Sequence, residues 1–282
     1  MLHTPVMANK VLEKLPKTSK LILDWTLWHG WHSKLILSKF DTIKIIWVDR
    51  DQSIINIAKT RLSNFKDRIT FIKESYKNLN TILRNKKIDA ILLDLWVNME
   101  HFKDPKRGFS IKYDWPLDMR FDTNSKITAK RILNNYTQDK LEIMFKKYWD
   151  FKWKLLDRII KSLEKNKHHI ETTFDLKYTL KNAWISEKKI AVIFQALRIE
   201  TNNELNHLEV FLKTFKNYLN KWWRCLIITY HSVEDRLVKY SFKSLENEWF
   251  KNLTKKVIFP DYEEIKTNKA SRSAKLRIVE KI

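Results

Sequence analysis

The sequence predicts an α/β protein, a doubly wound, Rossmann-like sheet with an inserted all-helical domain. Short apolar runs alternate with amphipathic helical stretches over the first third, residues 128–219 show only helical periodicity, and strand signals return near residue 226. Apolar strands alternating with helices are typical of a parallel sheet covered on both faces. We therefore expect a discontinuous sheet domain at 1–113 and 220–282, and a helical insertion at 114–219.

Short apolar runs predict the strands, and apolar residues repeated at helical spacing predict the helices between them. A helix is predicted over residues 32–40 with Ser33 as its N-cap, and a second helix begins at Ser53. In the insertion, helical stripes begin at Leu141 and Leu155. The predicted strands cover residues 21–23, 43–48, 69–72, 88–93, 226–230 and 276–279.

The composition is that of a globular protein with an excess of positive charge. Hydrophobic residues make up 44% of the 282 residues, and the net charge is +22. Such a charge repels itself unless a polyanion is near, so nucleic acid is the favoured partner. The alternative is a lysine-rich, solvated surface without a nucleic-acid partner.

The single cysteine, Cys225, excludes a disulfide framework and a cysteine-based zinc site. His168 and His169 fit an exposed loop, so no metal is expected. We find no signal peptide pattern and no apolar run long enough to span a bilayer. These observations predict a cytoplasmic protein that does not bind membranes, and they leave room for a homodimer.

Three aspartates end predicted strands: Asp24, Asp49 and Asp94. Ligands of doubly wound sheets bind at the carboxyl ends of the strands, near the switch point. Asp49 follows Gly30 by about twenty residues, where an acid accepts ribose hydroxyls of a nucleoside cofactor. An NAD-dependent oxidoreductase is disfavoured, because the loop lacks the dinucleotide fingerprint. The alternative is that these acids are solvated turn residues.

A series of motifs then gives a more specific prediction. They are the loop at residues 24–33 and the segments His3-Thr4-Pro5-Val6-Met7, Val48-Asp49-Arg50-Asp51, Leu92-Leu93-Asp94-Leu95, Arg107-Gly108-Phe109-Ser110, Pro116-Leu117-Asp118-Met119-Arg120, Phe194-Gln195-Ala196-Leu197-Arg198, His231-Ser232-Val233-Glu234-Asp235-Arg236 and Arg272-Ser273-Ala274-Lys275-Leu276-Arg277. In this order they resemble the bacterial cytosine-N4 methyltransferases of small-subunit (16S) rRNA over nearly the whole chain.

The resemblance implies a class I methyltransferase sheet, S-adenosyl-L-methionine as cofactor, and a cytosine near the decoding centre of the small subunit as substrate. It also implies that the helical insertion recognises this substrate. The implied cofactor contacts are Gly30, Trp31 and His32 in the loop, Asp49 on the ribose, Tyr76 on the adenine, Asp94 beside the adenine or the methionine end, and His101, where the family usually has glutamine.

The chain has 12 tryptophans but only 2 glycines, whereas average usage gives about 20 glycines. Many tryptophans stand where the related family usually carries glycine. A tight strand-to-helix turn needs the positive φ or the close backbone approach that glycine allows. Our hypothesis is that a reassigned codon, read as glycine in the cell, is written here as tryptophan; the alternative is real tryptophans that stack on RNA bases. The positions concerned are Trp25, Trp28, Trp31, Trp47, Trp96, Trp115, Trp149, Trp222 and Trp223.

The choice of methyl acceptor follows from the residues near the strand ends. Methylation at cytosine C5 requires a cysteine nucleophile, and Cys225 begins a predicted strand, away from the strand ends. An exocyclic amine instead needs orientation and a polar acceptor for its N–H groups. Asp94 and His231 are the candidate catalytic residues, although Asp94 could serve only the cofactor and His231 could be a structural histidine at the turn.

Basic and aromatic residues alternate after residue 103, which suits phosphate contacts and base stacking. We expect Arg107, Phe109, Asp118 and Arg120 to bind the RNA substrate; the alternative is a structured loop that closes the site. A different class of function, a non-catalytic RNA-binding or ribosome assembly factor on the same fold, is favoured if the tryptophans are real.

Overall fold

The computed structural model describes residues 5–26, 30–96, 102, 104–149 and 151–282. It divides into two compact units: Met1–Val97 together with Asn206–Ile282, here the sheet unit, and Asn98–Leu205, here the helical unit. No helix in the described ranges is long and apolar enough to cross a membrane.

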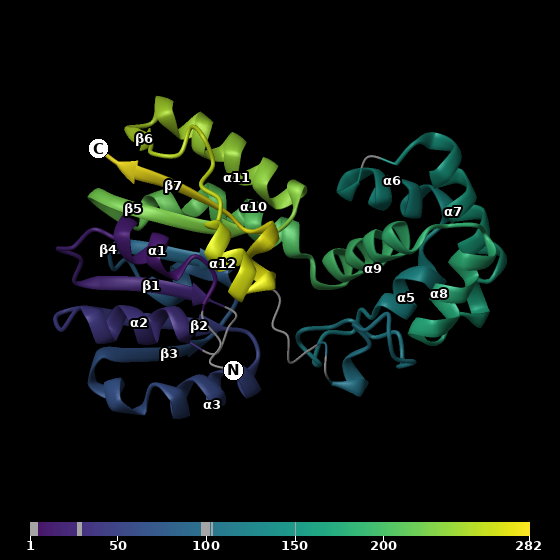
Figure 1. The fold of residues 1–282 in the computed structure, drawn as a ribbon, viewed down its shortest axis with the longest axis horizontal. Helices are drawn as coiled ribbons and strands as arrows, with labels where there is room; N and C mark the ends of the chain where they lie inside the picture. The colour runs from purple at the N-terminus through teal and green to yellow at the C-terminus, as the bar shows by residue number, and fades with distance from the viewer. Residues whose placement is uncertain (1–4, 27–29, 97–101, 103, 150) are drawn as a thin grey trace. The chain divides into compact units, whose positions relative to one another are not determined.

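The sheet unit is built on one seven-stranded sheet in the order β3-β2-β1-β4-β5-β7-β6 (Figure 1). The first five strands run parallel, while β7 is antiparallel to β5 and to β6. Chain order reverses between β1 and β4, which is the switch point of a doubly wound sheet. The strands are β1 (Leu21–Thr26), β2 (Lys44–Asp49), β3 (Ile69–Lys73), β4 (Ile88–Asp94), β5 (Leu219–Thr229), β6 (Phe250–Asn252) and β7 (Lys275–Lys281).

Both faces of the sheet are buried, because neighbouring residues of a strand enter different apolar clusters. Ile22 packs in one cluster with Val11, Ile36 and Ile54, whereas Leu23 packs in the other. The first cluster lies under α1 (Ala8–Lys14), α2 (Trp31–Lys39) and α3 (Gln52–Arg61), and the second under α4 (Leu79–Leu83), α10 (Glu204–Thr214) and α11 (Ser232–Ser244). Each fully buried Leu or Ile stabilises the fold by about 1.5–3 kcal/mol. A further helix, α12 (Tyr262–Thr267), precedes β7.

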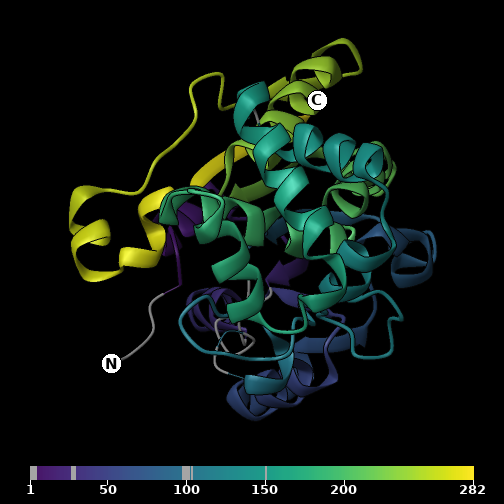
Figure 2. The ribbon, with the colours of Figure 1, turned by 90° about the vertical axis from the view of Figure 1, so that its right-hand side faces the viewer.

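The helical unit holds five α-helices in its described residues, drawn in teal to green in Figure 2. They are α5 (Ala129–Asn135), α6 (Gln138–Tyr148), α7 (Trp153–Lys165), α8 (Thr173–Asn182) and α9 (Glu187–Asn202). The stripe that begins at Leu141 is buried on α6, and on α7 the buried stripe runs from Leu156 to Leu163. The periodicity of the sequence therefore predicted the inner faces of these two helices.

The two units divide at other residues than those expected from the sequence. Residues 104–113 belong to the helical unit and not to the sheet unit; the Arg107 carbonyl accepts from the Met119 N–H at 2.8 Å, and the Tyr113 carbonyl accepts from the Thr173 hydroxyl at 2.7 Å. The helix α10 belongs to the sheet unit, because Leu208 and Phe211 lie in its apolar core. Helical periodicity alone gave no signal for which of two cores a helix packs against.

Two local expectations differ from the structure. The helix α2 begins at Trp31 with Gly30 as its N-cap, whereas Ser33 was expected to cap it. Ser33 lies buried inside α2, and its hydroxyl donates to Asp24 Oδ2. The short strand β6 was not predicted, since three residues are too few to show a period-two pattern.

Among the tryptophans suspected to be glycines, Trp222 has a left-handed backbone with φ +67°. It lies in β5 where the pairing with β4 shifts: Ile88 pairs with Leu219, but Ala90 pairs with Arg224. Trp184 and Trp249 also have positive φ, at +57° and +66°. Trp25 and Trp47 instead lie fully buried in strands. Trp28 lies outside the described residues.

Candidate active site

The candidate site lies at the carboxyl ends of β1, β2 and β4 (Figure 1), and each of these strands contains a buried aspartate. Asp49 and Asp94 are the last residues of β2 and β4. Asp24 lies deeper, because it pairs with Leu92 while Asp94 pairs with Thr26. Its partner is the Ser33 hydroxyl of α2. Asp24 therefore connects strand and helix below the site, and the other two aspartates stand at the strand ends.

Asp49 has one oxygen bound and one without a partner among the described residues. Its Oδ1 accepts from the Asp51 backbone N–H at 2.8 Å, while Oδ2 is buried and makes no hydrogen bond. Burial raises the pKa of Asp49 to about 7, against the lowering effect of that backbone hydrogen bond. A buried carboxylate oxygen without a donor is unfavourable. A ligand hydroxyl would satisfy it, which fits the ribose contact expected at this residue.

Asp94 is held by two donors on one oxygen. The Tyr230 hydroxyl donates to Oδ1 at 2.8 Å, and the Trp96 backbone N–H donates to the same atom at 3.1 Å. Burial raises the pKa of Asp94 to about 7, although the Tyr230 hydrogen bond lowers it. The two donors fix the carboxyl group and leave its Oδ2 facing His32.

His32 lies buried between the N-terminal segment and Asp94. Its Nε2 lies 2.9 Å from the Val6 carbonyl oxygen, so this nitrogen carries the proton and donates. The other nitrogen, Nδ1, is 3.8 Å from Asp94 Oδ2 and has no hydrogen bond within the described residues. Burial lowers the pKa of His32, against the opposing effect of Asp24. The imidazole is therefore neutral and presents an acceptor toward Asp94.

The predicted loop contacts begin with Gly30, whose φ is +74°. A Cβ atom there would lie 2.6 Å from Leu62 Cδ1, the end of a side chain that can shift, so it is the left-handed backbone that favours glycine. Trp31 opens α2, and the Arg61 guanidinium lies 4.2 Å from the centre of its ring. Gly30, the N-cap of α2, has no side chain to cap the helix, and the backbone N–H groups of a first helical turn favour polar or anionic groups of a ligand.

Tyr76 is buried, with its ring contacted edge-on by three others. The ring centres of Trp25, His207 and Phe211 lie 5.4, 5.9 and 6.2 Å away. The adenine stacking expected for Tyr76 therefore requires one of these neighbouring rings to move away. Glycine at position 25, as the codon hypothesis holds, would remove one of the three rings.

The structure adds a pair that the sequence did not reveal, Arg50 with His207. The Arg50 guanidinium donates to His207 Nδ1 at 3.3 Å. Burial, together with the charges of Arg50 and Lys77, lowers the pKa of His207 to about 3, so the imidazole is neutral and accepts. These residues are far apart in the chain, and only the packing of α10 on the sheet brings them together.

His231 is the N-cap of α11. Its Nδ1 accepts from the Glu234 backbone N–H at 3.4 Å, and Glu234 Oε2 accepts from the backbone N–H of His231 at 3.3 Å. Glu234 Oε2 also accepts from the Tyr230 N–H at 2.9 Å. The His231 Nε2 lies 3.0 Å from Glu234 Oε1 without hydrogen-bond geometry. This capping box fixes the turn that carries Tyr230.

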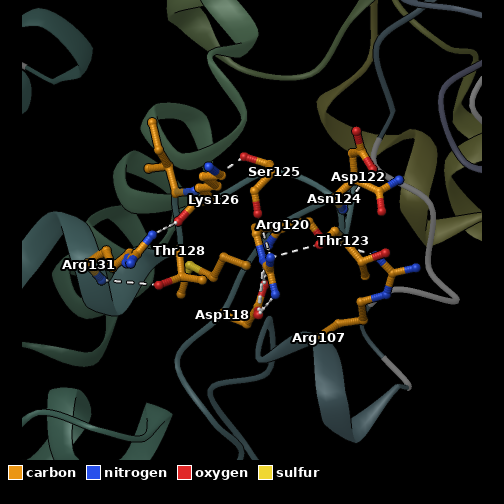
Figure 3. A network of polar contacts seen from close by, with 12 residues as sticks. Arg107, Asp118, Arg120, Asp122, Thr123, Asn124, Ser125, Lys126, Thr128 and Arg131 are labelled. Atoms are coloured by element: carbon orange, nitrogen blue, oxygen red, sulfur yellow. Dashed lines mark hydrogen bonds and ion pairs between the residues drawn. The ribbon is translucent and has the colours of Figure 1, made fainter.

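In the helical unit, Asp118 and Arg120 form the centre of a polar network (Figure 3). Arg120 Nε and Nη2 donate to the two carboxylate oxygens of Asp118 at 2.8 and 2.6 Å. Its Nη1 donates to the carbonyl oxygens of Thr123 and Ser125 at 2.8 and 2.5 Å. The two residues therefore shape the loop before α5.

The other two predicted substrate residues also make contacts within this unit. Arg107 Nη1 donates to the Phe121 carbonyl at 2.9 Å, and the buried ring of Phe109 stacks on Phe121 with centres 5.4 Å apart. Between them, a Cβ at Gly108 would lie 1.9 Å from the Pro116 carbonyl oxygen. Phe109 is thus a core residue in this structure, and contacts to RNA remain a prediction for all four.

Three further expectations concern groups at or near the site. His101, predicted to contact the cofactor, lies outside the part of the chain that the structure describes. Cys225 is buried within β5, and burial raises the pKa of its thiol well above the usual value. In the described ranges, no group of three or more His, Cys, Asp or Glu side chains is arranged to hold a metal ion.

Tyr230 is the functional candidate that the sequence did not single out. It ends the apolar run at residues 226–230 and directly precedes His231. Its place at the end of that predicted strand was a usable signal. The missing information was the sheet order, which makes β5 the neighbour of β4.

Comparison with known proteins agrees with this geometry. The sequence matches the MraW methylase family over residues 1–282. Proteins named Ribosomal RNA small subunit methyltransferase H are similar over most of their length. The one from Borreliella burgdorferi is 40% identical, covering 99% of this chain and 98% of that protein. The one from Petrotoga mobilis is 41% identical, covering 92% and 93%. The one from Leptospira interrogans is 41% identical, covering 99% and 89%.

Proposed function

Because the chain belongs to the MraW methylase family and is an S-adenosylmethionine-dependent methyltransferase, we propose that it methylates N4 of a cytosine in the decoding region of small-subunit rRNA. Its relatives are named as methyltransferases of small-subunit ribosomal RNA. The net charge of +22 suits an RNA substrate. The proposal places the protein in the cytoplasm with the ribosome. It does not depend on a homodimer, because all the proposed cofactor residues belong to one chain.

The observation that carries the proposal is the pair of buried carboxylates at the ends of β2 and β4, the two strands that flank β1. Asp49 Oδ2 has no donor within the described structure, which fits a cofactor ribose. Asp94 Oδ2 is left open by the donors on Oδ1. The cofactor, when bound, supplies an electrophilic methyl group on its sulfonium. The protein then has to hold an acceptor amine in line with that methyl group.

In this proposal Asp94 accepts a hydrogen bond from the exocyclic amine of cytosine. That amine is a weak nucleophile because its lone pair is conjugated with the ring. An N–H bond to a fixed carboxylate orients the nitrogen and favours its pyramidal form. His32 Nδ1, 3.8 Å from Asp94 Oδ2, is placed to share the proton that the amine releases.

His231 contributes to the proposed reaction through position. It caps α11 and holds the turn at Tyr230, whose hydroxyl fixes Asp94. On the substrate side, Arg107, Phe109, Asp118 and Arg120 are proposed to shape the loop that meets the RNA. Asp118 and Arg120 fix its backbone, and the basic groups of the segment supply positive charge for phosphates.

The test is methyl transfer from tritiated S-adenosylmethionine to small subunits isolated from a strain without this modification. Digestion of the RNA to nucleosides should give labelled N4-methylcytidine, and Asp94→Asn should reduce its rate by about 100-fold or more. Label in another nucleoside would refute the N4 assignment. Label outside the decoding region would refute the position.

A second candidate function, a non-catalytic RNA-binding factor, is favoured by one observation, the packing of Trp25 against Tyr76 at 5.4 Å. The chain as written would then bind the cofactor weakly. Titration with S-adenosylhomocysteine separates the two: if Trp25→Gly gains affinity, the cofactor site exists and the indole obstructs it. If neither protein binds while both bind RNA, the non-catalytic function is correct.

A further inference from the structure

An exposed group of aromatic and basic side chains lies on the helical unit, on the loop at residues 111–115 and the first turns of α8. We call it the aromatic surface and define it by Tyr113, Phe174 and Tyr178 with Lys112 and Lys177. Tyr113 and Tyr178 are exposed, at 59% and 52%. Phe174 meets Tyr178 edge-on, with ring centres 5.6 Å apart.

The loop and the helix are joined by five hydrogen bonds, so the surface is fixed; one of them runs from the Trp115 backbone N–H to the Thr173 hydroxyl at 3.1 Å. The Thr173 hydroxyl donates to the Tyr113 carbonyl at 2.7 Å, and the Thr173 backbone N–H donates to the Trp115 carbonyl at 2.8 Å. Phe174 N–H donates to Asp114 Oδ1 at 3.2 Å. Lys177 Nζ donates to the Ile111 carbonyl at 3.2 Å. A ligand that binds here meets rings that are already positioned, which reduces the entropy lost on binding.

Two lysines flank the exposed rings, and the carboxylates nearby are bound within the protein. Asp175 belongs to the capping box of α8, and Asp114 accepts the Phe174 N–H. Glu171 and Glu187 form ion pairs with Lys130 and Lys181. Lys112 is exposed, and Lys177 Nζ lies 5.2 Å from the centre of the Phe174 ring. Exposed ring faces flanked by lysines suit a ligand that is flat, apolar on its faces and anionic along its chain.

We propose that the aromatic surface binds unpaired nucleotides of the substrate RNA, by stacking bases on Tyr113 and Tyr178. This inference rests on the proposed function and adds a location on the helical unit. Unpaired bases are favoured because bases in a duplex already stack on their neighbours. A protein partner is disfavoured because lysine is depleted at protein–protein interfaces. Trp115 stacks on Tyr113 at 5.3 Å, but the proposal does not use it, since position 115 is one of the suspected glycines.

The experiment compares Tyr178→Ala with Tyr240→Ala in the full-length protein. Tyr240 is a matched control: it is 60% exposed against 52% for Tyr178, it also lies on a helix, and a lysine precedes each. The probe is a fluorescent single-stranded oligonucleotide with the sequence of the decoding region, measured by anisotropy. Tyr178→Ala should weaken binding about 5- to 100-fold, as expected for one lost base stack, and Tyr240→Ala should not.

Further measurements separate stacking from charge and from misfolding. Tyr178→Phe keeps the ring and should bind as the unchanged protein does, and a second variant, Tyr113→Ala, should weaken binding as Tyr178→Ala does. Lys112→Gln should lower the salt dependence of binding by about one phosphate contact, whereas Tyr178→Ala should leave that dependence unchanged. A fully paired duplex of the same sequence should bind equally to Tyr178→Ala and the unchanged protein.

The inference is overturned if both tyrosine variants bind the single strand as Tyr240→Ala does, while the unchanged protein methylates small subunits. It is also overturned if these variants lose self-association or a protein partner and keep RNA affinity. The proposed function fails separately: small subunits then stay unmethylated by the unchanged protein even when S-adenosylhomocysteine binds to it.

Discussion

The hydroxyl of Tyr230 donates to Asp94 Oδ1 at 2.8 Å, across two neighbouring parallel strand ends. The ring of Tyr230 is held in turn by Trp96, with ring centres 4.5 Å apart. Burial, and then the charge of Asp94, raise the pKa of Tyr230 well above its usual value, so the phenol stays protonated and remains a donor. Tyr230, which follows the next strand, therefore fixes the position of the Asp94 carboxyl group and lowers its pKa. Asp94 is the group proposed to accept a hydrogen bond from the substrate amine.

Tyr230→Phe should move the pH dependence of methyl transfer upward. Asp94 has its pKa raised to about 7 by burial, and the Tyr230 hydrogen bond lowers it. If Asp94 acts as a carboxylate, kcat rises with pH through the pKa of this group. Without the hydroxyl the midpoint should rise by about one pH unit. Tyr218→Phe, which removes an exposed hydroxyl bound to Asn80, is the control; the same midpoint in all three proteins would contradict the prediction.

Asp49→Asn should make the protein more stable at pH 8 and weaken its cofactor binding. The folded pKa of Asp49 is raised to about 7 from a usual 3.8, so the folded state binds more protons between these values. The free energy of unfolding therefore falls as pH rises through this window. Asparagine does not ionise, so the variant should gain about 1–3 kcal/mol at pH 8. Its advantage should shrink toward pH 4.

Denaturant unfolding at pH 4.5 and pH 8 measures the effect of Asp49→Asn, and titration with S-adenosylhomocysteine measures binding. The control is Asp41→Asn, a change at an exposed aspartate in the turn before β2. A stability difference that is the same at both pH values would show that ionisation of Asp49 is not its cause.

Glycine in place of Trp184, Trp222 or Trp249 should stabilise the fold. Their φ angles are +57°, +67° and +66°, and their side chains are 85%, 67% and 77% exposed, so little apolar burial is lost. Each exchange should raise the free energy of unfolding by about 1 kcal/mol, since L residues with side chains resist this backbone. Trp153 is the matched control: it is 72% exposed but begins helix α7. Trp153→Gly should lower stability. A gain in stability in this variant would show that the positive φ angles are not the cause of the gain at the other three positions.

Arg120→Lys should destabilise the helical unit by about 1–2 kcal/mol, because an ammonium group cannot reproduce the paired bonds to Asp118 and the bonds to two carbonyls. Arg131→Lys is the control, since the exposed Arg131 guanidinium donates to the Lys126 carbonyl alone in Figure 3. Hydrogen exchange of residues 118–128 should rise only in the Arg120 variant. Equal protection from exchange in both variants would show that the hydrogen bonds of Arg120 do not stabilise this loop.

The sheet was predictable because each inner strand is buried on both faces and so reads as a continuous apolar run. Residues 43–48 and 88–93 gave β2 and β4 almost to their last residues. The strand β5 was predicted to begin late, since the chain before Arg224 follows a shifted register. The division between units depended on which core α10 enters, and a helical stripe alone does not contain that information.

Within the site, the strand-end acids were predicted from position, whereas their partners were not. Asp49 and Asp94 stand where apolar runs end, and a sequence shows such ends directly. The pairs Tyr230–Asp94, His32–Asp94 and Arg50–His207 join segments that are distant in sequence. The predicted substrate residues were ambiguous for another reason. Arginine and phenylalanine side chains stabilise a loop as readily as they contact RNA. Phe109, stacked on Phe121, is the plainest case.

Because β4 ends at Asp94 and its neighbour β5 begins at Leu219, the whole helical unit is synthesised between two adjacent strands. In a chain that ends before β5, this edge of β4 has no pairing strand, and we expect the helices, whose contacts are local, to form before β5 pairs. Their folding brings the ends of the intervening chain closer and lowers the entropy lost when β5 arrives. Tyr230 meets Asp94 only then, so an incomplete nascent chain lacks the contact that positions the proposed catalytic carboxylate.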